Sequence, residues 1–475
     1  MEAAKKFDIK KLLFIVIPII VGVGIALIPP PAGLERPAMI FMGIFVCAIL
    51  WLITDVIKDY IVVILAMALF VLLQVSDIKT VFAPFAGSSV WVVIGAFAIA
   101  AMVGKCGLLK RIALIVLKIF PENFTGQIMA LFATGIVISP MIPSLTAKGA
   151  ILAPFAASAS KALGYIKNSK AAAGMFCAAW ISAGILGCAF MSGAVPVFTI
   201  LGMLPAEAQA EWGWVRWFLA AAIWFVVITV LSFVAILVIY NPKKEKASEQ
   251  VEVEKGFAQK QLAELGPMSR NEKWAAFFLA LALLGWIFGK QLGIDSGIWA
   301  VTIMCLMAIF GLMTPQDFGT RISWSSVFFI GGVFSLAAMI SALEINTWLA
   351  GLLGPIMEPL AGNPFIFITV ICLATYLLRL VVISQTATLA IFFAALGGVS
   401  AASGINPWVL LFVCYMSTLV WHFSFTNVTY ASTLGATNGE ITDHKQTIPM
   451  NIAYLAINLI ACLASVPVWK LMGLL

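Results

Sequence analysis

The sequence predicts an all-α integral membrane protein with about eleven transmembrane helices and two re-entrant hairpins. Of its 475 residues, 63% are hydrophobic and only 10% are charged, whereas soluble proteins carry about 25% charged residues. The apolar residues lie in blocks of roughly 16 to 28, and a helix needs about 20 residues to cross the hydrocarbon core. The blocks are continuous and do not alternate, which excludes a closed β-barrel, the other fold that satisfies backbone groups in lipid.

Eleven apolar blocks are each long enough for one span. The first follows four lysines, as a signal peptide would, but it is long and no Ala-x-Ala cleavage site occurs in 26–33, so we expect a retained span. Eight scattered cysteines without a Cys-x-x-Cys pair, and only two histidines, argue against a disulfide framework or a zinc site. The predicted spans are 11–28, 37–53, 60–75, 88–104, 174–200, 214–240, 274–290, 296–313, 326–343, 408–435 and 447–470.

Two further apolar regions, 126–160 and 364–402, are too long for one helix, and small polar residues interrupt each near its middle. We expect both to be re-entrant hairpins, with tips at 144–146 and 384–386. This arrangement puts the N-terminus in the cytoplasm and the C-terminus outside. The charges agree, because 21 of the 28 Lys and Arg residues fall in the predicted inside loops and 5 in the outside loops. The net charge of +7 therefore indicates topology, and no nucleic-acid partner is expected.

A charged stretch at 241–273 divides the chain into two similar halves and predicts a partly helical cytoplasmic linker. Each half contains the pattern Ser-x-Thr-Ala, beginning at Ser144 and at Ser384, at a similar distance after a matching apolar block. Each pattern is followed by a long span that small or polar residues interrupt, at 187–196 and at 424–429. The matching hairpins enter from opposite sides, so the repeats are inverted, as is typical of secondary transporters with a binding site near the midplane.

The two hairpin tips predict an anion site. Ser144 and Ser384 are good N-caps, so a helix can begin after each of them. Each tip would direct free backbone N–H groups and a dipole of about +0.5 charge at the midplane. Two such ends that face one cavity bind an anion with neutral groups, and the hydroxyls of Thr146 and Thr386 add donors. A ligand with two carboxylates suits two opposed tips best.

Three ionisable residues near the tips each have two interpretations. A cation inside the membrane is costly and functional by default, so Lys148 either supplies positive charge to the anion site, or reaches a watery vestibule or a carboxylate partner. Arg379 either steers anions to the outer vestibule or snorkels to the interface. His422 either couples protons to transport or is a structural hydrogen-bond donor.

The chain resembles the divalent anion/sodium symporter family, which includes di- and tricarboxylate transporters of the sodium:sulfate symporter type. The resemblance covers nearly the whole chain, and its most specific parts are 84–95, 107–113 and the two tips. It implies an elevator-type transporter, in which a scaffold domain dimerises and a transport domain moves as a rigid body. The implied divisions are N-terminal scaffold helices at 1–87, a first inverted repeat at 88–240, the linker at 241–273, scaffold helices at 274–325 and a second inverted repeat at 326–475.

The resemblance also implies site residues. It assigns substrate binding to the tips, through Ser144, Thr146, Ser384 and Thr386. It assigns it more weakly to the interrupted spans, around Ser192, Gly193 and Ala194 and around Thr426 and Asn427. Sodium is the implied coupling ion, at Ser144, Gly193, Ser384 and Gln385, and no other cofactor is expected. With Lys148 added as the cation within the membrane, the candidate substrate-binding residues are Ser144, Leu145, Thr146, Lys148, Ser384, Gln385, Thr386, Thr426 and Asn427.

The tips depart from the family's Ser-Asn-Thr pattern. Gln385 keeps an amide oxygen one methylene further out, whereas Leu145 has no side-chain ligand to offer an ion. We therefore hypothesise that Lys148 supplies the charge that sodium supplies elsewhere, which favours anion exchange or proton coupling over sodium symport.

The predicted protein is a secondary transporter of small organic anions of the malate, succinate, 2-oxoglutarate and citrate class. We expect a homodimer in the cell membrane, with a lipid bilayer and a small anion as its partners. An inorganic oxyanion such as sulfate is the alternative substrate. A channel would need rings of charge along a pore, and the apolar spans of this sequence lack them. An intramembrane enzyme would need paired aspartates or a zinc motif at depth, and the acidic residues fall almost wholly in loops.

Overall fold

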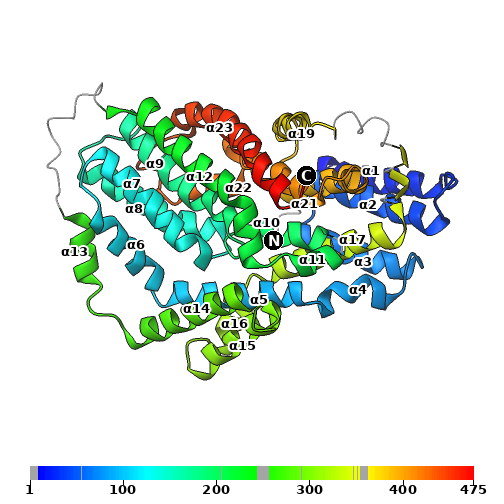
Figure 1. Ribbon diagram of the computed structural model, residues 1–475, viewed down its shortest axis with the longest axis horizontal. Helices are drawn as coiled ribbons and strands as arrows, with labels where there is room; N and C mark the ends of the chain where they lie inside the picture. The colour runs from blue at the N-terminus through cyan, green and yellow to red at the C-terminus, as the bar shows by residue number, and fades with distance from the viewer. Residues whose placement is uncertain are drawn as a thin grey trace, which may run out of the picture.

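The computed structural model describes residues 9–54, 56–204, 206–242, 256–289, 291–345, 347–349, 351–352 and 362–475. Over these residues all regular secondary structure is helical (Figure 1). Ten of the described helices are long and apolar enough to cross a membrane, and four shorter apolar helices accompany them. The all-helical membrane fold that the composition predicts is therefore confirmed.

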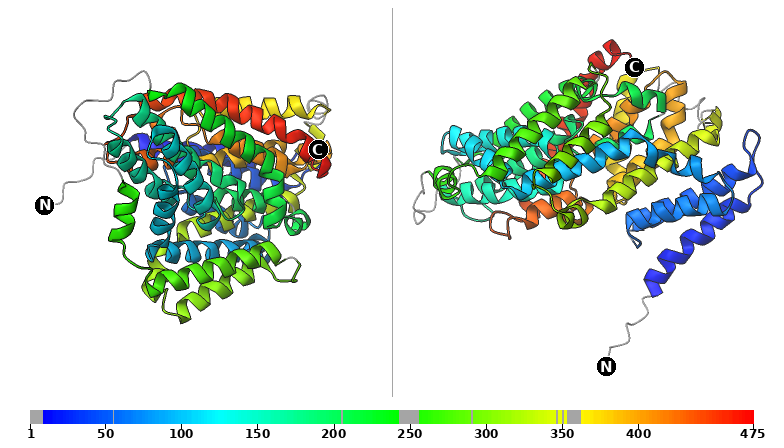
Figure 2. Two further views of the ribbon diagram at one scale, coloured as in Figure 1. Left: turned by 60° about the vertical axis from the view of Figure 1, so that its left-hand side comes forward. Right: turned by 90° about the horizontal axis from the view of Figure 1, so that it is seen from below.

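The first two helices form a pair that projects from the rest of the molecule (Figure 2, right). Helices α1 (Ile9–Leu27) and α2 (Arg36–Thr54) pack closely where Gly22 meets Gly43, because a Cβ at either glycine would collide with the other backbone. Small residues at such crossings are typical of helices in lipid. Most large apolar side chains of α1 are exposed, as expected of a lipid-facing span.

Two later parts of the described chain, on either side of the linker, repeat one order of elements: two helices, a long helix, a hairpin, a broken helix and a long final helix. The first repeat also has the connecting helices α6 (Leu108–Ile119) and α11 (Ala206–Glu211). Its other elements are α3 (Asp59–Leu72), α4 (Ile78–Ala86), α5 (Ser88–Lys105), the hairpin α7 (Phe124–Ile138) and α8 (Leu145–Ala162), the broken helix α9 (Lys170–Gly184) and α10 (Val195–Met203), and α12 (Trp214–Ile239). The second repeat has α15 (Ser296–Ile309), α16 (Pro315–Arg321), α17 (Trp324–Ala342), the hairpin α19 (Pro364–Leu378) and α20 (Gln385–Ala402), the broken helix α21 (Pro407–Thr418) and α22 (Val428–Gly435), and α23 (His444–Leu471).

The two repeats pack on each other reciprocally. Helix α5 of the first repeat packs against α15 of the second, and α17 of the second packs against α3 of the first. The two final helices, α12 and α23, lie side by side across the top of the view in Figure 1. In each case the long third helix of one repeat contacts the first helix of the other. Such an exchange of equivalent contacts is what an approximate two-fold axis between the repeats produces, and it agrees with the internal repeat in the sequence.

The part of the linker that the structure describes is helical and docked. It contains α13 (Phe257–Glu264) and leads into α14 (Arg270–Phe288), whereas 243–255 lies outside the described residues. Arg111 of α6 donates to the Glu272 carboxylate at 2.7 Å and to the Gly266 carbonyl at 2.8 Å. A bidentate guanidinium that also takes backbone carbonyls is a strong clamp, so this end of the linker is fixed to α6.

Candidate functional site

The first hairpin is broken at its tip, as the sequence predicts. Helix α7 ends at Ile138, a single 3-10 turn covers Ser139–Met141, and extended backbone at Ser144 precedes α8. The Ser144 Oγ accepts a hydrogen bond from the Ala147 N–H at 3.2 Å, which is the N-cap geometry. The side chains of Thr146 and Ala147 are exposed, so the N-terminus of α8 opens onto solvent-accessible space.

The second tip has the same construction. Helix α19 ends at Leu378, and α20 begins at Gln385 after an extended Ser384. The Ser384 Oγ accepts from the Ala387 N–H at 3.1 Å and lies 3.1 Å from the Thr386 Oγ1. The repeated Ser-x-Thr-Ala pattern therefore makes the same cap twice, and each cap leaves helix N–H groups at a tip.

The first tip lies against the break in the first broken helix. Helix α9 ends at Gly184, and α10 begins only at Val195. The Val195 N–H donates to the Pro143 carbonyl at 2.9 Å. The Ser192 hydroxyl donates to the Pro140 carbonyl at 2.7 Å. Polar groups of the first hairpin tip and of the first broken helix thus pair with each other. Such pairing is how irregular backbone is tolerated at membrane depth.

The second tip lies against the second break, between α21 and α22. The Gln385 amide donates to the Thr418 carbonyl at the end of α21, at 3.4 Å. Asn427 caps α22 by accepting from the Tyr430 N–H at 3.0 Å, and its own amide donates to the Leu419 and Val420 carbonyls at 3.1 and 3.2 Å. The side chain of Asn427 therefore holds the break open.

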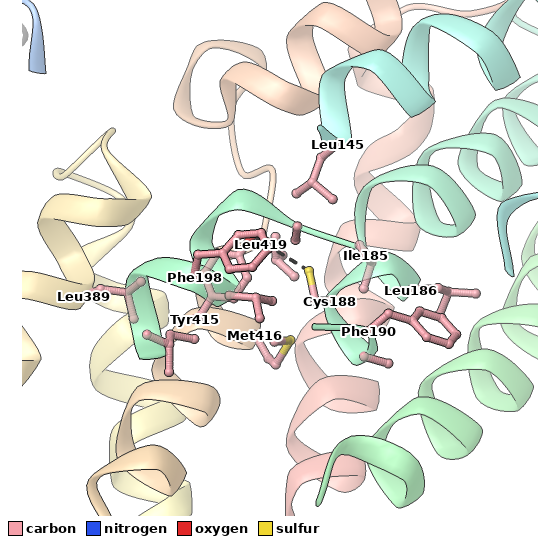
Figure 3. Packing of buried hydrophobic residues seen from close by; sticks show 14 of the residues in the cluster. Leu145, Ile185, Leu186, Cys188, Phe190, Phe198, Leu389, Tyr415, Met416 and Leu419 are labelled. Atoms are coloured by element: carbon pink, nitrogen blue, oxygen red, sulfur yellow. Dashed lines mark hydrogen bonds between the residues drawn. The ribbon is translucent and has the colours of Figure 1, made fainter. Parts of the chain in front are cut away.

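The first break and the first hairpin pack against the broken helix of the second repeat (Figure 3). Cys188, in the first break, lies with its Sγ 3.8 Å from the Tyr415 hydroxyl of α21. The side chain of Leu145 is buried in the same apolar cluster. Nearby, Gly149 of α8 packs against Thr433 of α22, where a Cβ would collide with the threonine hydroxyl. The two repeats thus contribute adjoining halves of one region.

A buried cation belongs to each tip. Lys148 is 0% exposed, and its Nζ donates to the Gly193 carbonyl in the first break at 2.7 Å. Gly187 has no side chain, which leaves room for this ammonium. Arg379 is also 0% exposed, and it donates to the carbonyls of Val382, Ile383 and Thr426. In each repeat, therefore, the cation of the hairpin binds a carbonyl of the broken helix.

Neither cation has an acidic partner within the part of the chain that the structure describes. The ion pairs among the described residues include neither Lys148 nor Arg379. The sequence has no Asp or Glu at all within 123–206 or within 359–439, the segments that form the hairpins and broken helices. Burying an unpaired charge costs several kcal/mol, so each of these cations attracts an anion to its own tip.

The contacts of Lys148 and Arg379 bear on two of the open interpretations of the sequence. Lys148 has no carboxylate partner within the described residues and is fully buried in this conformation. Both expectations for Arg379 are wrong, because the guanidinium neither lines a vestibule nor reaches the interface but turns back onto the tip backbone. Its contact with Thr426, 47 residues further along the chain, was not predicted from the sequence.

Comparison with known proteins identifies the family. The family model described as the sodium:sulfate symporter transmembrane region matches residues 9–474. The chain belongs to this symporter family. Its relatives include the inner membrane protein YbhI of Escherichia coli K12, which is 29% identical over 357 residues and 73% of each chain. The chloroplastic dicarboxylate transporter 1 of Spinacia oleracea is 24% identical over 412 residues, 85% of this chain and 71% of that protein.

Two further comparisons agree with this membership. The L-tartrate/succinate antiporter of Escherichia coli strain 536 is 24% identical over 389 residues, 76% of this chain and 78% of that one. The fold is also similar to the solved structure of MtrF from Neisseria gonorrhoeae, which is described as one of a class of antimetabolite efflux pumps. The two structures match with a TM-score of 0.58 at 15% identity, over 97% of this chain and 95% of the MtrF chain. At that identity the likeness to MtrF concerns the fold alone, which is that of a multi-pass membrane transporter.

The residues that the resemblance implies as sodium ligands divide between two places in this symporter-family protein. Ser144 and Gly193 lie at the first tip and its break, whereas Ser384 and Gln385 lie at the second tip. The Gly193 carbonyl already accepts from the Lys148 ammonium. One of the oxygen ligands expected for sodium, the Gly193 carbonyl, therefore already accepts a hydrogen bond from a cation of the protein itself.

Proposed function

We propose that this protein is a secondary transporter that exchanges small dicarboxylate anions across a membrane. One observation carries the proposal: each repeat holds a buried cation, Lys148 or Arg379, beside a capped helix N-terminus, and neither cation has an acidic partner among the described residues. Two fixed positive charges and two helix ends match a ligand with two separated carboxylates. The names of the spinach dicarboxylate transporter and of the tartrate/succinate antiporter point to the same substrate class.

Exchange follows from the charge balance. A bound dianion neutralises the two cations, so the loaded site can be closed off from water at little electrostatic cost. The empty site keeps two uncompensated charges, each of which costs several kcal/mol to desolvate. Because every 1.4 kcal/mol slows a step about tenfold, the empty transporter returns slowly, and a second dicarboxylate on the far side speeds the return.

The same geometry argues for sodium independence. Sodium symport would supply mobile cations to balance the substrate, and the Gly193 carbonyl would be one of their ligands. Here the Lys148 ammonium takes that carbonyl at 2.7 Å. We propose that Lys148 stands in the place of a coupling ion at the first tip, and that Ser144 and Thr146 bind a substrate carboxylate beside it.

The second tip completes the site in this proposal. Ser384, Gln385 and Thr386 bind the other carboxylate. The Arg379 guanidinium donates to the carbonyls of Val382 and Ile383, the two residues before the tip, and so places a positive charge next to it. Thr426 and Asn427 are mainly engaged in holding the break, so we assign them a supporting role in shaping the site.

We further propose that transport is of the elevator type, with the hairpins and broken helices moving together against the scaffold helices of a homodimer. Hydrogen bonds from both tips to their breaks would keep the moving part rigid. The N-terminus of the protein would be cytoplasmic and its C-terminus external, as the distribution of Lys and Arg favours. A sulfate-like oxyanion is the second candidate substrate, since the family description names sulfate.

Uptake into proteoliposomes tests the function. The purified protein is reconstituted, the vesicles are preloaded with malate, and entry of labelled malate, succinate, tartrate, citrate or sulfate is measured with and without sodium. We expect rapid entry of the dicarboxylates, independent of sodium and dependent on the internal malate. Entry of sulfate alone would assign the oxyanion, and no flux of any anion would overturn the proposed function.

A further inference from the structure

A cavity of about 490 Å³ lies where the first broken helix meets two neighbouring long helices. Its walls come from the junction of α4 and α5, from the end of α10 with α11, and from α17. Helix α10, part of the broken helix, packs against both α5 and α17, which belong to neither a hairpin nor a broken helix (Figure 1). The residues that line this cavity, which we name the α10–α17 chamber, include Ser89, Met203, Gln209, Phe334, Ala337 and Ser341.

Two walls of the chamber touch at a glycine. A Cβ at Gly202 of α10 would overlap the ring of Phe334 of α17, so the close approach of the two helices needs glycine at this position. The buried ring of Phe334 also forms part of the chamber wall. A displacement of α10 along α17 would therefore change the shape of the chamber, and this shape belongs to the conformation that the structure shows.

The chamber is apolar at its bottom and polar at its mouth. Phe334 and Ala337 at the bottom are buried, whereas Ser341 is exposed and Ser89 and Gln209 are half-buried. Among the described residues that line the chamber, none has a charged side chain. Apolar walls with a few convergent polar groups, in a volume of about 300–1,000 Å³, are typical of a small-molecule site.

The polar groups at the mouth suit a hydroxylated head group. The Gln209 amide donates to the Leu204 carbonyl at 2.8 Å, and the Ser89 hydroxyl donates to the Gln209 Oε1 at 3.3 Å. The second distance is longer than the roughly 2.7–2.8 Å that is usual for a hydroxyl donor, so a hydroxyl of a ligand can replace this contact at little cost. A charged head group would lose water here without gaining a counter-charge from the described lining.

We propose that the α10–α17 chamber binds an uncharged, single-chain amphipath of the monoacylglycerol type. The alkyl chain lies on the buried apolar bottom, and the hydroxyls of the head group bond to the polar groups at the mouth, Ser89, Gln209 and Ser341. Because the ligand contacts α10 and α17 together, it stabilises the conformation in which the two helices meet at Gly202.

Photo-cross-linking tests the site without any assumption about transport. The purified protein in nanodiscs is exposed to a monoacylglycerol that carries a diazirine in its chain, and the labelled peptides are mapped. We expect the labels to concentrate in 83–89, 202–209 and 334–341, and to be displaced by unlabelled monodecanoylglycerol but not by malate. Labels that spread evenly over lipid-facing helices such as α1 and α12, or that malate displaces, would overturn the proposal.

The dependence of binding on chain length separates a closed chamber from simple partition into the bilayer. Referred to the free aqueous concentration, the Kd should fall about fourfold per added methylene and level off once the chamber is full. Ala338→Phe places a ring in the chamber and should end this fall at a shorter chain, whereas Ala402→Phe, at an exposed site on α20, should not. A Kd that falls without a limit, or with the same limit in all three proteins, would contradict the site.

A smaller substitution tests the head-group contacts with little risk to folding. Ser89→Ala should weaken binding at every chain length by roughly 2- to 10-fold, the effect of one neutral hydrogen bond. Unchanged binding would rule out the assignment of the head group to the mouth.

The consequence for transport rests on the proposed function, whereas binding does not. If the broken helices move against α5 and α17, monodecanoylglycerol should slow malate exchange in proteoliposomes, and it should do so at higher concentrations in Ser89→Ala. Labelling of the chamber without slower exchange would refute the stabilised conformation. A protein that binds the amphipath and exchanges no malate would overturn the proposed function and leave the binding site standing.

Discussion

Lys148→Gln is the most informative substitution, because it removes one fixed cation and keeps a polar side chain. The ammonium has three donors, and the Gly193 carbonyl uses one of them at 2.7 Å. The others are available to a substrate carboxylate. A charge-assisted hydrogen bond is worth about 1.5–3 kcal/mol, so we expect the KM for malate to rise roughly 10- to 150-fold.

The assay is exchange of labelled malate in proteoliposomes, in sodium-containing and in sodium-free buffer. Removing the ammonium frees the Gly193 carbonyl for another cation, so sodium should restore part of the lost rate in Lys148→Gln and have no effect on the natural protein. Lys161→Gln is the matched control, because Lys161 lies on the same helix, α8, with an exposed side chain. Transport by Lys148→Gln that equals the natural protein in both buffers would refute the reasoning.

The remaining predictions concern the second cation, helix packing and a surface ion pair. Arg379→Lys should retain more exchange than Arg379→Gln, since the charge survives although the fork to three carbonyls is lost; equal loss in both would assign Arg379 a purely structural role. Gly149→Ala should lower the melting temperature and slow exchange, because the new Cβ meets Thr433 and overpacking costs about 1–3 kcal/mol; Gly24→Ala, whose Cβ meets nothing, should do neither. Asp317→Asn should lower the melting temperature at neutral pH. The hydrogen bond from the Lys105 ammonium, with others from Thr314, holds the pKa of Asp317 below its ordinary value. The ionised form therefore stabilises the fold fully above about pH 4, and the difference from the natural protein should shrink steadily as the pH falls from there toward the lower pKa of the folded state. Glu264→Gln, at an exposed site, is the control, and a gap that does not shrink in acid would contradict the ion pair.

The local sequence was sufficient to predict the helix breaks. Ser144 and Ser384 cap their helices as the repeated pattern indicates, because a cap depends on residues within one turn. The second break begins earlier than the predicted 424–429, since α21 already ends at Thr418. The cause is Asn427, whose amide takes the Leu419 and Val420 carbonyls and so competes with the helix.

The partners of the buried charged and polar groups could not be predicted from local sequence. Lys148 was visible as a cation in an apolar hairpin, but its acceptor, Gly193, is 45 residues away. The His444 ring contacts the Tyr430 hydroxyl and the His422 carbonyl, which lie in two other segments. One signal in the sequence did point to the site as a whole, namely the absence of acidic residues from 123–206 and 359–439, because a cation in an acid-free region must find its counter-charge elsewhere.

Efflux of labelled malate from loaded proteoliposomes is the decisive test of the proposal that Lys148 and Arg379, and not sodium, provide the positive charge of the site. Vesicles are diluted into sodium-free buffer that contains either no dicarboxylate or saturating unlabelled malate, and then into the same buffers with sodium. We expect slow efflux into the buffer without dicarboxylate, strong acceleration by external malate, and no effect of sodium on either rate. Efflux that is equally fast without external malate, or that requires sodium, would contradict it.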